Sequence, residues 1–302
     1  MSTTESITEL DVDDVSPGDV AIPTLRAALA DDENLVRDRA AAVCVTFADE
    51  DVEVVLPLLP AIITAARDEN VNVALKAVTV LNVVAQQRPT ELKETTETLA
   101  TLLTHDLPRV QLFAAKAVQT IGAEHPEWFT SHPEPLLEAL RADITDPTSE
   151  ATELTGTMAD PLQRQFAAVS HGEQFQQYSV QATAGNLLIE IADRDPAAIA
   201  PYAPAIMDAL TAEDLNVVAC AAEILGRIGQ METVDTAELV PPLVECLDSE
   251  SEVVAARAIT ALGHIGSATA VEPLRSAAKR YDNGDLRELA VRTADWLDRE
   301  RA

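Results

Sequence analysis

A valine that recurs every 37 residues constrains the fold of this chain more than any other sequence feature. It stands in one column, with steps of 37, 37, 70, 37 and 37 residues: Val36, Val73, Val110, Val180, Val217 and Val254. Four residues later every unit has an alanine: Ala40, Ala77, Ala114, Ala184, Ala221 and Ala258. Apolar residues also recur seven, eight and eleven residues after the valine, and these spacings mark one face of an α-helix. The repeat therefore predicts six equivalent amphipathic helices.

A second helix is predicted upstream of each of these. Its apolar column is Leu25, Ile62, Leu99, Leu136, Ile206 and Leu243. A proline column lies early in this helix or at a kink: Pro23, Pro60, Pro204 and Pro241. Acidic residues recur between the two helices, where they suit the start of the second one: Asp32, Glu69, Asp106, Glu213 and Glu250. Each unit thus reads helix, turn, helix, and units must stack because a lone pair cannot bury its apolar stripe.

The period, the proline of the first helix, the turn acid and the Val-Ala-Leu-Ile-Gly pattern of the second helix resemble HEAT repeats of the ARM/HEAT-like class. The resemblance implies an all-α fold, a right-handed α-α superhelix of about seven helix pairs. We expect residues 17–302 to form a single solenoid and residues 1–16 to form an acidic, disordered tail. The last unit, near residues 268–300, departs from the register but still contains two amphipathic helices.

The one irregular step, 70 instead of 37, indicates that 33 residues are inserted between the helices of the fourth unit. The insertion covers about residues 142–174. Its first half has the composition of a loop. In its second half Leu162, Phe166 and Val169 are spaced as on a short amphipathic helix. Two interpretations stay open: the helix folds back on the solenoid as an ornament, or the insertion contacts a partner.

Charge narrows the classes of partner. The chain has 51 acidic and 21 basic residues, a net charge of −30. Nucleic acids and anionic membrane surfaces require clustered cations, so neither is expected to bind. The acidic, lysine-poor composition resembles that of proteins from extremely halophilic archaea, where salt screens the self-repulsion. The sequence shows no secretory signal, membrane span or disulfide framework, which predicts a cytoplasmic protein.

No motif in the sequence specifies catalysis. The five histidines lack metal-site spacing, and there is no His-Glu dipeptide of the kind that binds iron in deoxyhypusine hydroxylase, an enzyme built of such repeats. Two other families of helical-repeat proteins also fit poorly. Bilin lyases have repeats shorter than 37 residues, and DNA-alkylation repair solenoids have basic concave faces, whereas this chain is acidic. No cofactor or metal is expected, and the chain is predicted not to be an enzyme.

Surface residues are the remaining candidates for function. In HEAT proteins the second helices line the concave side, and helical positions pointing away from the core would be exposed there. These candidate partner-binding residues are Val45, Leu75, Asn82, Leu112, Lys116, Gln119, Asn186 and Ile189, together with Leu162, Phe166 and Val169 of the insertion. A row of exposed apolar side chains on an otherwise acidic protein indicates a partner surface.

The first hypothesis is therefore a non-catalytic scaffold or adaptor that binds other proteins on the concave face and through the insertion, for example in a signalling or taxis/motility complex. Two alternatives stay open. One is an enzyme or enzyme subunit of the lyase or hydroxylase type, which a bound metal or chromophore would favour. The other is a structural solenoid that assembles with itself.

Overall fold

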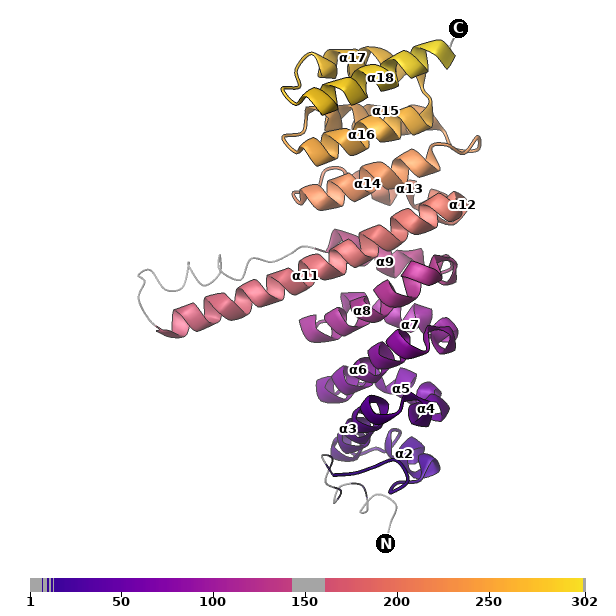
Figure 1. Cartoon of the computed structure of the whole chain (residues 1–302), viewed down its shortest axis with the longest axis vertical. Helices are drawn as coiled ribbons and strands as arrows, with labels where there is room; N and C mark the ends of the chain where they lie inside the picture. The colour runs from indigo at the N-terminus through magenta and orange to yellow at the C-terminus, as the bar shows by residue number, and fades with distance from the viewer. Residues whose placement is uncertain (1–6, 8–9, 11, 13, 143–160, 301–302) are drawn as a thin grey trace. The chain divides into compact units, whose positions relative to one another are not determined.

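The computed structural model describes residues 7, 10, 12, 14–142 and 161–300, with only the helical backbone described for residues 161–175 and 300. Apart from one isolated bridge between Pro17 and Val20, the described chain is built from helices and connecting turns (Figure 1). It divides into two compact units. Unit 1 comprises Met1–Trp128 and Asp143–Val180, and unit 2 comprises Phe129–Ala142 and Gln181–Ala302.

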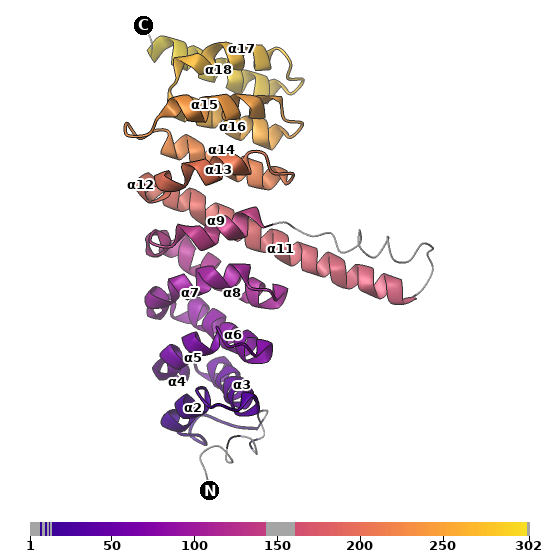
Figure 2. The ribbon, with the colours of Figure 1, turned by 180° about the vertical axis from the view of Figure 1, so that it is seen from behind.

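Unit 1 contains three complete helix pairs. The second helices have 17 residues each and start 37 residues apart: α3 (Asn34–Glu50), α6 (Val71–Gln87) and α8 (Pro108–Glu124). The first helices are short and partly 3-10: α2 (Ile22–Ala28); α4 (Val52–Val55), η1 (Leu56–Leu58) and α5 (Leu59–Ala65); η2 (Pro89–Thr95), α7 (Thr96–Thr101) and η3 (Leu102–Thr104). The second helices lie side by side in one layer, with the first helices behind them (Figures 1 and 2).

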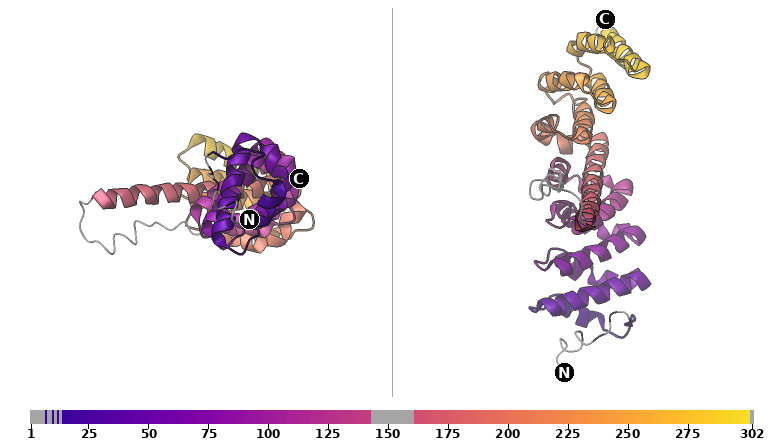
Figure 3. Two further views of the ribbon diagram at one scale, coloured as in Figure 1. Left: turned by 90° about the horizontal axis from the view of Figure 1, so that it is seen from below. Right: turned by 90° about the vertical axis from the view of Figure 1, so that its left-hand side faces the viewer.

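Unit 2 continues the same alternation. After η4 (Pro126–Phe129), its first helices are α9 (Pro133–Arg141); α12 (Pro196–Ile199), η5 (Ala200–Tyr202) and α13 (Ala203–Ala209); α15 (Thr236–Glu245) and η6 (Cys246–Asp248); η7 (Ala268–Ala270) and α17 (Val271–Ala278). Its second helices are the C-terminal part of α11 (Pro161–Arg194), α14 (Leu215–Ile228), α16 (Glu252–Ile265) and α18 (Gly284–Glu300). Successive pairs stack within this unit (Figure 3). The described chain thus has the predicted all-α architecture of stacked helix pairs.

The repeat columns form the core. All six column valines and all six column alanines are buried, as the spacing predicts. Pro23, Pro60 and Pro204 are each the second residue of their helix, where the missing N–H group would have no partner in any case. Pro241 lies further inside α15 because this helix begins earlier in its unit. The predicted proline position is therefore confirmed for three of the four units.

One detail of the repeat differs from the prediction. The acidic column lies in the turn, and the side chain that caps the second helix comes one residue later, as in Asn70, Asp214 and Ser251. The last unit departs from the 37-residue step, as predicted, and contains two amphipathic helices, α17 and α18. Leu286 stands 32 residues after Val254, and the buried Ala290, Ala294 and Leu297 follow it at the usual spacing. The departure is a shorter first half of the unit, which leaves the helix pattern unchanged.

The helix predicted within the insertion is the beginning of α11. This helix runs without a break from Pro161 to Arg194, 34 residues, twice the length of α8 (Figure 1). A separate short helix is therefore the wrong description. The physical reason is that no proline follows Pro161 until the helix ends, so nothing in the sequence stops it before it joins the repeat helix.

A recurring hydrogen bond locates the base of the insertion. In other pairs the residue after the column valine donates to the carbonyl six residues earlier: Arg37 to Asp31 (2.9 Å) and Gln111 to His105 (2.7 Å). In the fourth pair Gln181 donates to the carbonyl of Ala142 (2.6 Å), 39 residues earlier. The separation of 39 residues equals the usual six plus the 33 inserted residues. The same turn contact is therefore present in the fourth pair, and the insertion lies between its two residues.

The N-terminal segment contradicts the prediction of a disordered tail wherever it is described. Ile7 and Val15 are buried, and the carbonyl oxygens of Leu10 and Val12 accept hydrogen bonds from Arg39 and Thr46 of α3. The described part of this segment therefore lies against α3 of the first helix pair. None of the helices in the described part of the chain is long and apolar enough to cross a membrane.

Candidate functional site

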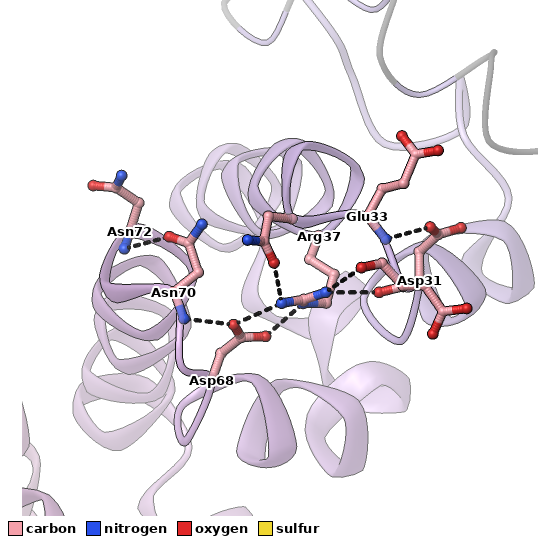
Figure 4. Close-up of polar contacts among 8 residues, drawn as sticks. Asp31, Glu33, Arg37, Asp68, Asn70 and Asn72 are labelled. Carbon is pink, nitrogen blue, oxygen red and sulfur yellow. Dashed lines mark hydrogen bonds and ion pairs between the residues drawn. The ribbon is translucent and has the colours of Figure 1, made fainter.

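A hydrogen-bond network fixes how α3 and α6 of unit 1 lie relative to each other (Figure 4). The Arg37 Nε and Nη2 atoms donate to the two carboxylate oxygens of Asp68 at 2.6 and 3.0 Å. Arg37 also donates to the Asn34 side chain (2.6 Å) and to the Asp31 carbonyl, and Asp68 accepts from the backbone N–H of Asn70. Because the Arg37 guanidinium donates to Asp68, the pKa of this carboxyl lies below its ordinary value. The network joins the start of α3 to the turn that precedes α6, so it ties two neighbouring repeats together.

We define the second-helix face as the positions of each second helix that point away from its buried row. On α6 these are Asn72, Leu75, Lys76, Thr79, Val83 and Gln86. On α8 they are Arg109, Leu112, Phe113, Lys116, Gln119, Thr120 and Ala123. Since α6 and α8 are neighbours in unit 1, we call these two sets together the α6–α8 face.

The predicted apolar residues are less exposed than expected. Val45, Leu75 and Leu112 of unit 1, and Ile189 of unit 2, are half-buried. The helical spacing places them on the correct side, but each side chain is only partly accessible. The prediction overestimated how exposed these side chains are. Three of them lie in unit 1 and are partly exposed, so a partner-binding surface on unit 1 stays a prediction.

The predicted polar residues fall into two groups. Lys116, Gln119 and Asn186 are exposed, as expected. Asn82 is buried, with 6% of its surface accessible, and its Oδ1 atom has no hydrogen-bond partner among the described residues. A buried oxygen is costly to leave unpaired. The prediction that Asn82 is an exposed contact residue is wrong, because its side chain is buried.

The predicted row is divided between the units. Six of the residues lie in unit 1: Val45, Leu75, Asn82, Leu112, Lys116 and Gln119. Asn186 and Ile189 belong to unit 2, on α11. Leu162, Phe166 and Val169 lie on the backbone of α11, and their side chains are outside the described residues.

Sequence reasoning identified Lys116 but missed Lys76, Arg109 and the Phe113 ring on the α6–α8 face. Lys76 of α6 pairs with Asp38 of α3. Lys116 places its ammonium group 5.2 Å from the centroid of the Phe113 ring, within reach of a cation–π contact. Arg109 is exposed one turn before these residues. The sequence could have revealed these residues, because they lie next to the predicted positions on the same face of the helix.

None of the positions that define the α6–α8 face carries a carboxylate, although acidic residues are 51 of the 302 in the chain; the exposed Glu124, at the C-terminal end of α8, borders the face. Its side chains are aliphatic, aromatic, amide, hydroxyl or cationic. On the second-helix face of unit 2, by contrast, carboxylates and cations neutralise one another: Arg227 contacts Asp193 at 2.7 Å, and Arg257 pairs with Glu223. The two faces thus offer different surfaces to a partner.

Burial shifts the pKa of several nucleophilic and titratable side chains among the described residues. Burial raises the pKa of the Cys44 thiol to about 12 and also raises the pKa of Cys220, so both favour the unreactive protonated form. Burial, followed by the charge of Arg227, lowers the pKa of His264. Within the described part of the chain no group of three His, Cys, Asp or Glu side chains could hold a metal ion.

Comparison with known proteins places the architecture among helical repeats. Residues 240–302, the last two helix pairs, match the family model described as HEAT repeats. No curated protein matches the chain.

Several solved structures share the fold at low sequence identity. An engineered protein has a TM-score of 0.55 at 20% identity, with 91% of this chain and 67% of that chain covered. A second engineered protein has a TM-score of 0.51 at 20% identity, with 80% and 96% covered. A structure describing a phosphorylation switch in the interaction between cadherin and β-catenin has a TM-score of 0.52 at 16% identity, with 92% of this chain covered. This chain spans only 57% of that one, and identities of this size establish the fold alone.

Proposed function

We propose that this chain is a non-catalytic scaffold that binds other proteins on the second-helix face of unit 1. The observation that carries the proposal is the α6–α8 face. It combines partly exposed apolar side chains, Leu75, Leu112 and Phe113, with the absence of any carboxylate, on a chain of net charge −30. A surface selected only for contact with water would have no reason to exclude the residues that cover the rest of the molecule.

The rigidity of this face supports the same function. The helices α6 and α8 are held by a packed core, and the network around Arg37 and Asp68 ties the start of α6 to α3. A partner that docks there meets an ordered surface, so little conformational entropy of the scaffold is lost on binding. The solved structure that concerns cadherin and β-catenin shares this fold, which favours protein binding as the use of such a surface.

The insertion, the charge and the composition of the chain add further parts to this proposal. The insertion, with Leu162, Phe166 and Val169 on α11, is proposed as a second contact surface because its length exceeds what the repeat requires. The charge disfavours nucleic acid as a partner. The composition favours molar salt as the working solvent, and the proposal includes that setting. A signalling or motility complex is the proposed setting.

Affinity capture in molar salt tests the proposal. The double variant Leu75→Asp/Leu112→Asp places two charges on the α6–α8 face and should lose the captured partner. The matched control is Leu215→Asp/Val253→Asp, which changes two exposed aliphatic side chains on second helices of unit 2 and should retain it.

Thermal unfolding and circular dichroism of both variants show whether each one is folded. Equal partner recovery from folded samples of the two variants would contradict the proposed face. A metal or chromophore that copurifies in stoichiometric amount would instead favour an enzyme.

A further inference from the structure

The cations of the α6–α8 face point to the chemistry of the partner. Lys76 already has a carboxylate partner in Asp38. Arg109 and Lys116 are exposed, and neither forms an ion pair with any described residue. On a chain with 51 carboxylates, two cations of one helix are thus left without a counter-ion from the described fold.

The spacing of the two cations defines a recognition unit. Arg109 and Lys116 are seven residues apart on α8, which is about 10 Å along the helix axis. Leu112 and Phe113 lie between them on the same side, both half-buried. A ligand that satisfies all four side chains needs apolar groups in its centre and carboxylates about 10 Å apart at its two ends. An amphipathic helix with acidic residues at i and i+7 and apolar residues at i+3 and i+4 has this arrangement.

Resting on the proposed function, we propose that the α6–α8 face binds an acidic amphipathic segment of a partner protein. Carboxylates of the segment pair with Arg109 and Lys116, and its apolar side chains pack on Leu112 and Phe113, with Leu75 of α6 beside them. The absence of carboxylates from this face removes the like-charge repulsion that an acidic ligand would meet elsewhere on the surface.

The net charge of the chain gives this interaction an unusual dependence on salt. At low ionic strength a chain of charge −30 repels an acidic segment over a long distance. At molar salt the screening length falls to about 3 Å, so the distant carboxylates no longer act and only the contacts on the face remain. Binding of the acidic segment should therefore strengthen as salt is raised from low to molar concentration. Binding of a basic segment, which the net negative charge attracts, would instead weaken over this range of salt concentration.

The test uses the full chain and a display library of random 16-residue peptides, selected in molar salt. The expected outcome is enrichment of peptides that combine aspartate or glutamate with leucine or phenylalanine. These peptides should bind Arg109→Glu/Lys116→Glu at least about tenfold more weakly than the parent. The control Arg292→Glu/Arg299→Glu carries the same change in charge on exposed positions of α18 in unit 2 and should bind like the parent.

Three outcomes would overturn the inference: enrichment of basic peptides, absence of any enriched peptide, or equal binding of acidic peptides by the two charge-reversed variants. The proposed function is tested separately. If Leu75→Asp/Leu112→Asp loses the captured partner while Arg109→Glu/Lys116→Glu retains it, the face binds proteins but the acidic chemistry is wrong. If folded Leu75→Asp/Leu112→Asp retains it, the proposed face itself fails.

Discussion

Replacing Gly226 by alanine should destabilise unit 2, although alanine is the better helix former. Gly226 lies on α14 where α16 comes close. A Cβ atom at this position would stand 2.6 Å from the Cα and 2.8 Å from the Cβ of Ala261. Ordinary contact begins near 3.4 Å, so the two helices must separate by about 0.8 Å. The obstructing Cα belongs to the backbone and cannot rotate away.

The magnitude follows from two opposing contributions. Alanine in place of glycine within a helix stabilises by about 1 kcal/mol. Overpacking of a close contact costs about 1–3 kcal/mol, and a backbone obstruction belongs at the upper end. The net loss expected for Gly226→Ala is therefore about 2 kcal/mol, which corresponds to roughly 4–8 °C in the thermal midpoint of a unit of this size.

Thermal unfolding followed by circular dichroism at one fixed salt concentration measures this loss. Gly284→Ala is the control, because a Cβ atom there meets nothing within 4 Å. Its midpoint should stay within about 1 °C of the parent. A Gly226→Ala midpoint equal to or above that of the parent would refute the close approach of α14 and α16.

Three further predictions concern charge, pH and the insertion. The thermal midpoint should rise between low and molar salt, because the self-repulsion of net charge −30 is screened; a flat or falling midpoint would contradict this. Because Arg37 lowers the folded pKa of Asp68 below its ordinary 3.8, the pair contributes stability above about pH 4 that is lost as pH falls toward the folded value. Asp68→Asn should therefore lower the urea midpoint at neutral pH and reduce its dependence on acid below about pH 4, and unchanged acid dependence would count against the pair. Gln181→Met removes the hydrogen bond to Ala142 and should cost about 1–2 kcal/mol in urea unfolding, as Gln111→Met should in unit 1; no loss in either would show that the turn contact is not stabilising.

The repeat architecture was accessible from the sequence because it depends on a pattern repeated six times. The column valines and alanines are buried because a helix presents residues at these spacings to one neighbour, whatever the rest of the unit contains. The insertion could be located by arithmetic for the same reason. The hydrogen bond from Gln181 to Ala142 is the contact in the structure that marks the two ends of the insertion.

Features that depend on one copy of a pattern were harder to predict. The length of α11 is set by the absence of a helix stop after Pro161, and the amphipathic spacing around Phe166 did not reveal that it joins the repeat helix. The last unit departs from the 37-residue step, so its valine position, occupied by the buried Leu286, could not be assigned by the repeat spacing. The exposure of Leu75 depends on side chains of neighbouring helices, which are distant in sequence.

The candidate face shows the same division. Helical spacing identified the correct side of α6 and α8, and with it Leu75, Leu112 and Lys116. It did not identify Phe113 beneath the Lys116 ammonium group, or the burial of Asn82, because these depend on how side chains of the folded helices share space.

Site-specific photo-crosslinking tests the central claim most directly. A photoreactive amino acid is placed at Leu112 on α8 in one sample and at Leu215 on α14 in another, and both are irradiated in a native lysate at molar salt. The proposed face predicts that a discrete partner protein is crosslinked from position 112 and that position 215 yields none. Equal crosslinking from both positions, or crosslinking from position 215 alone, would contradict a partner-binding face on unit 1.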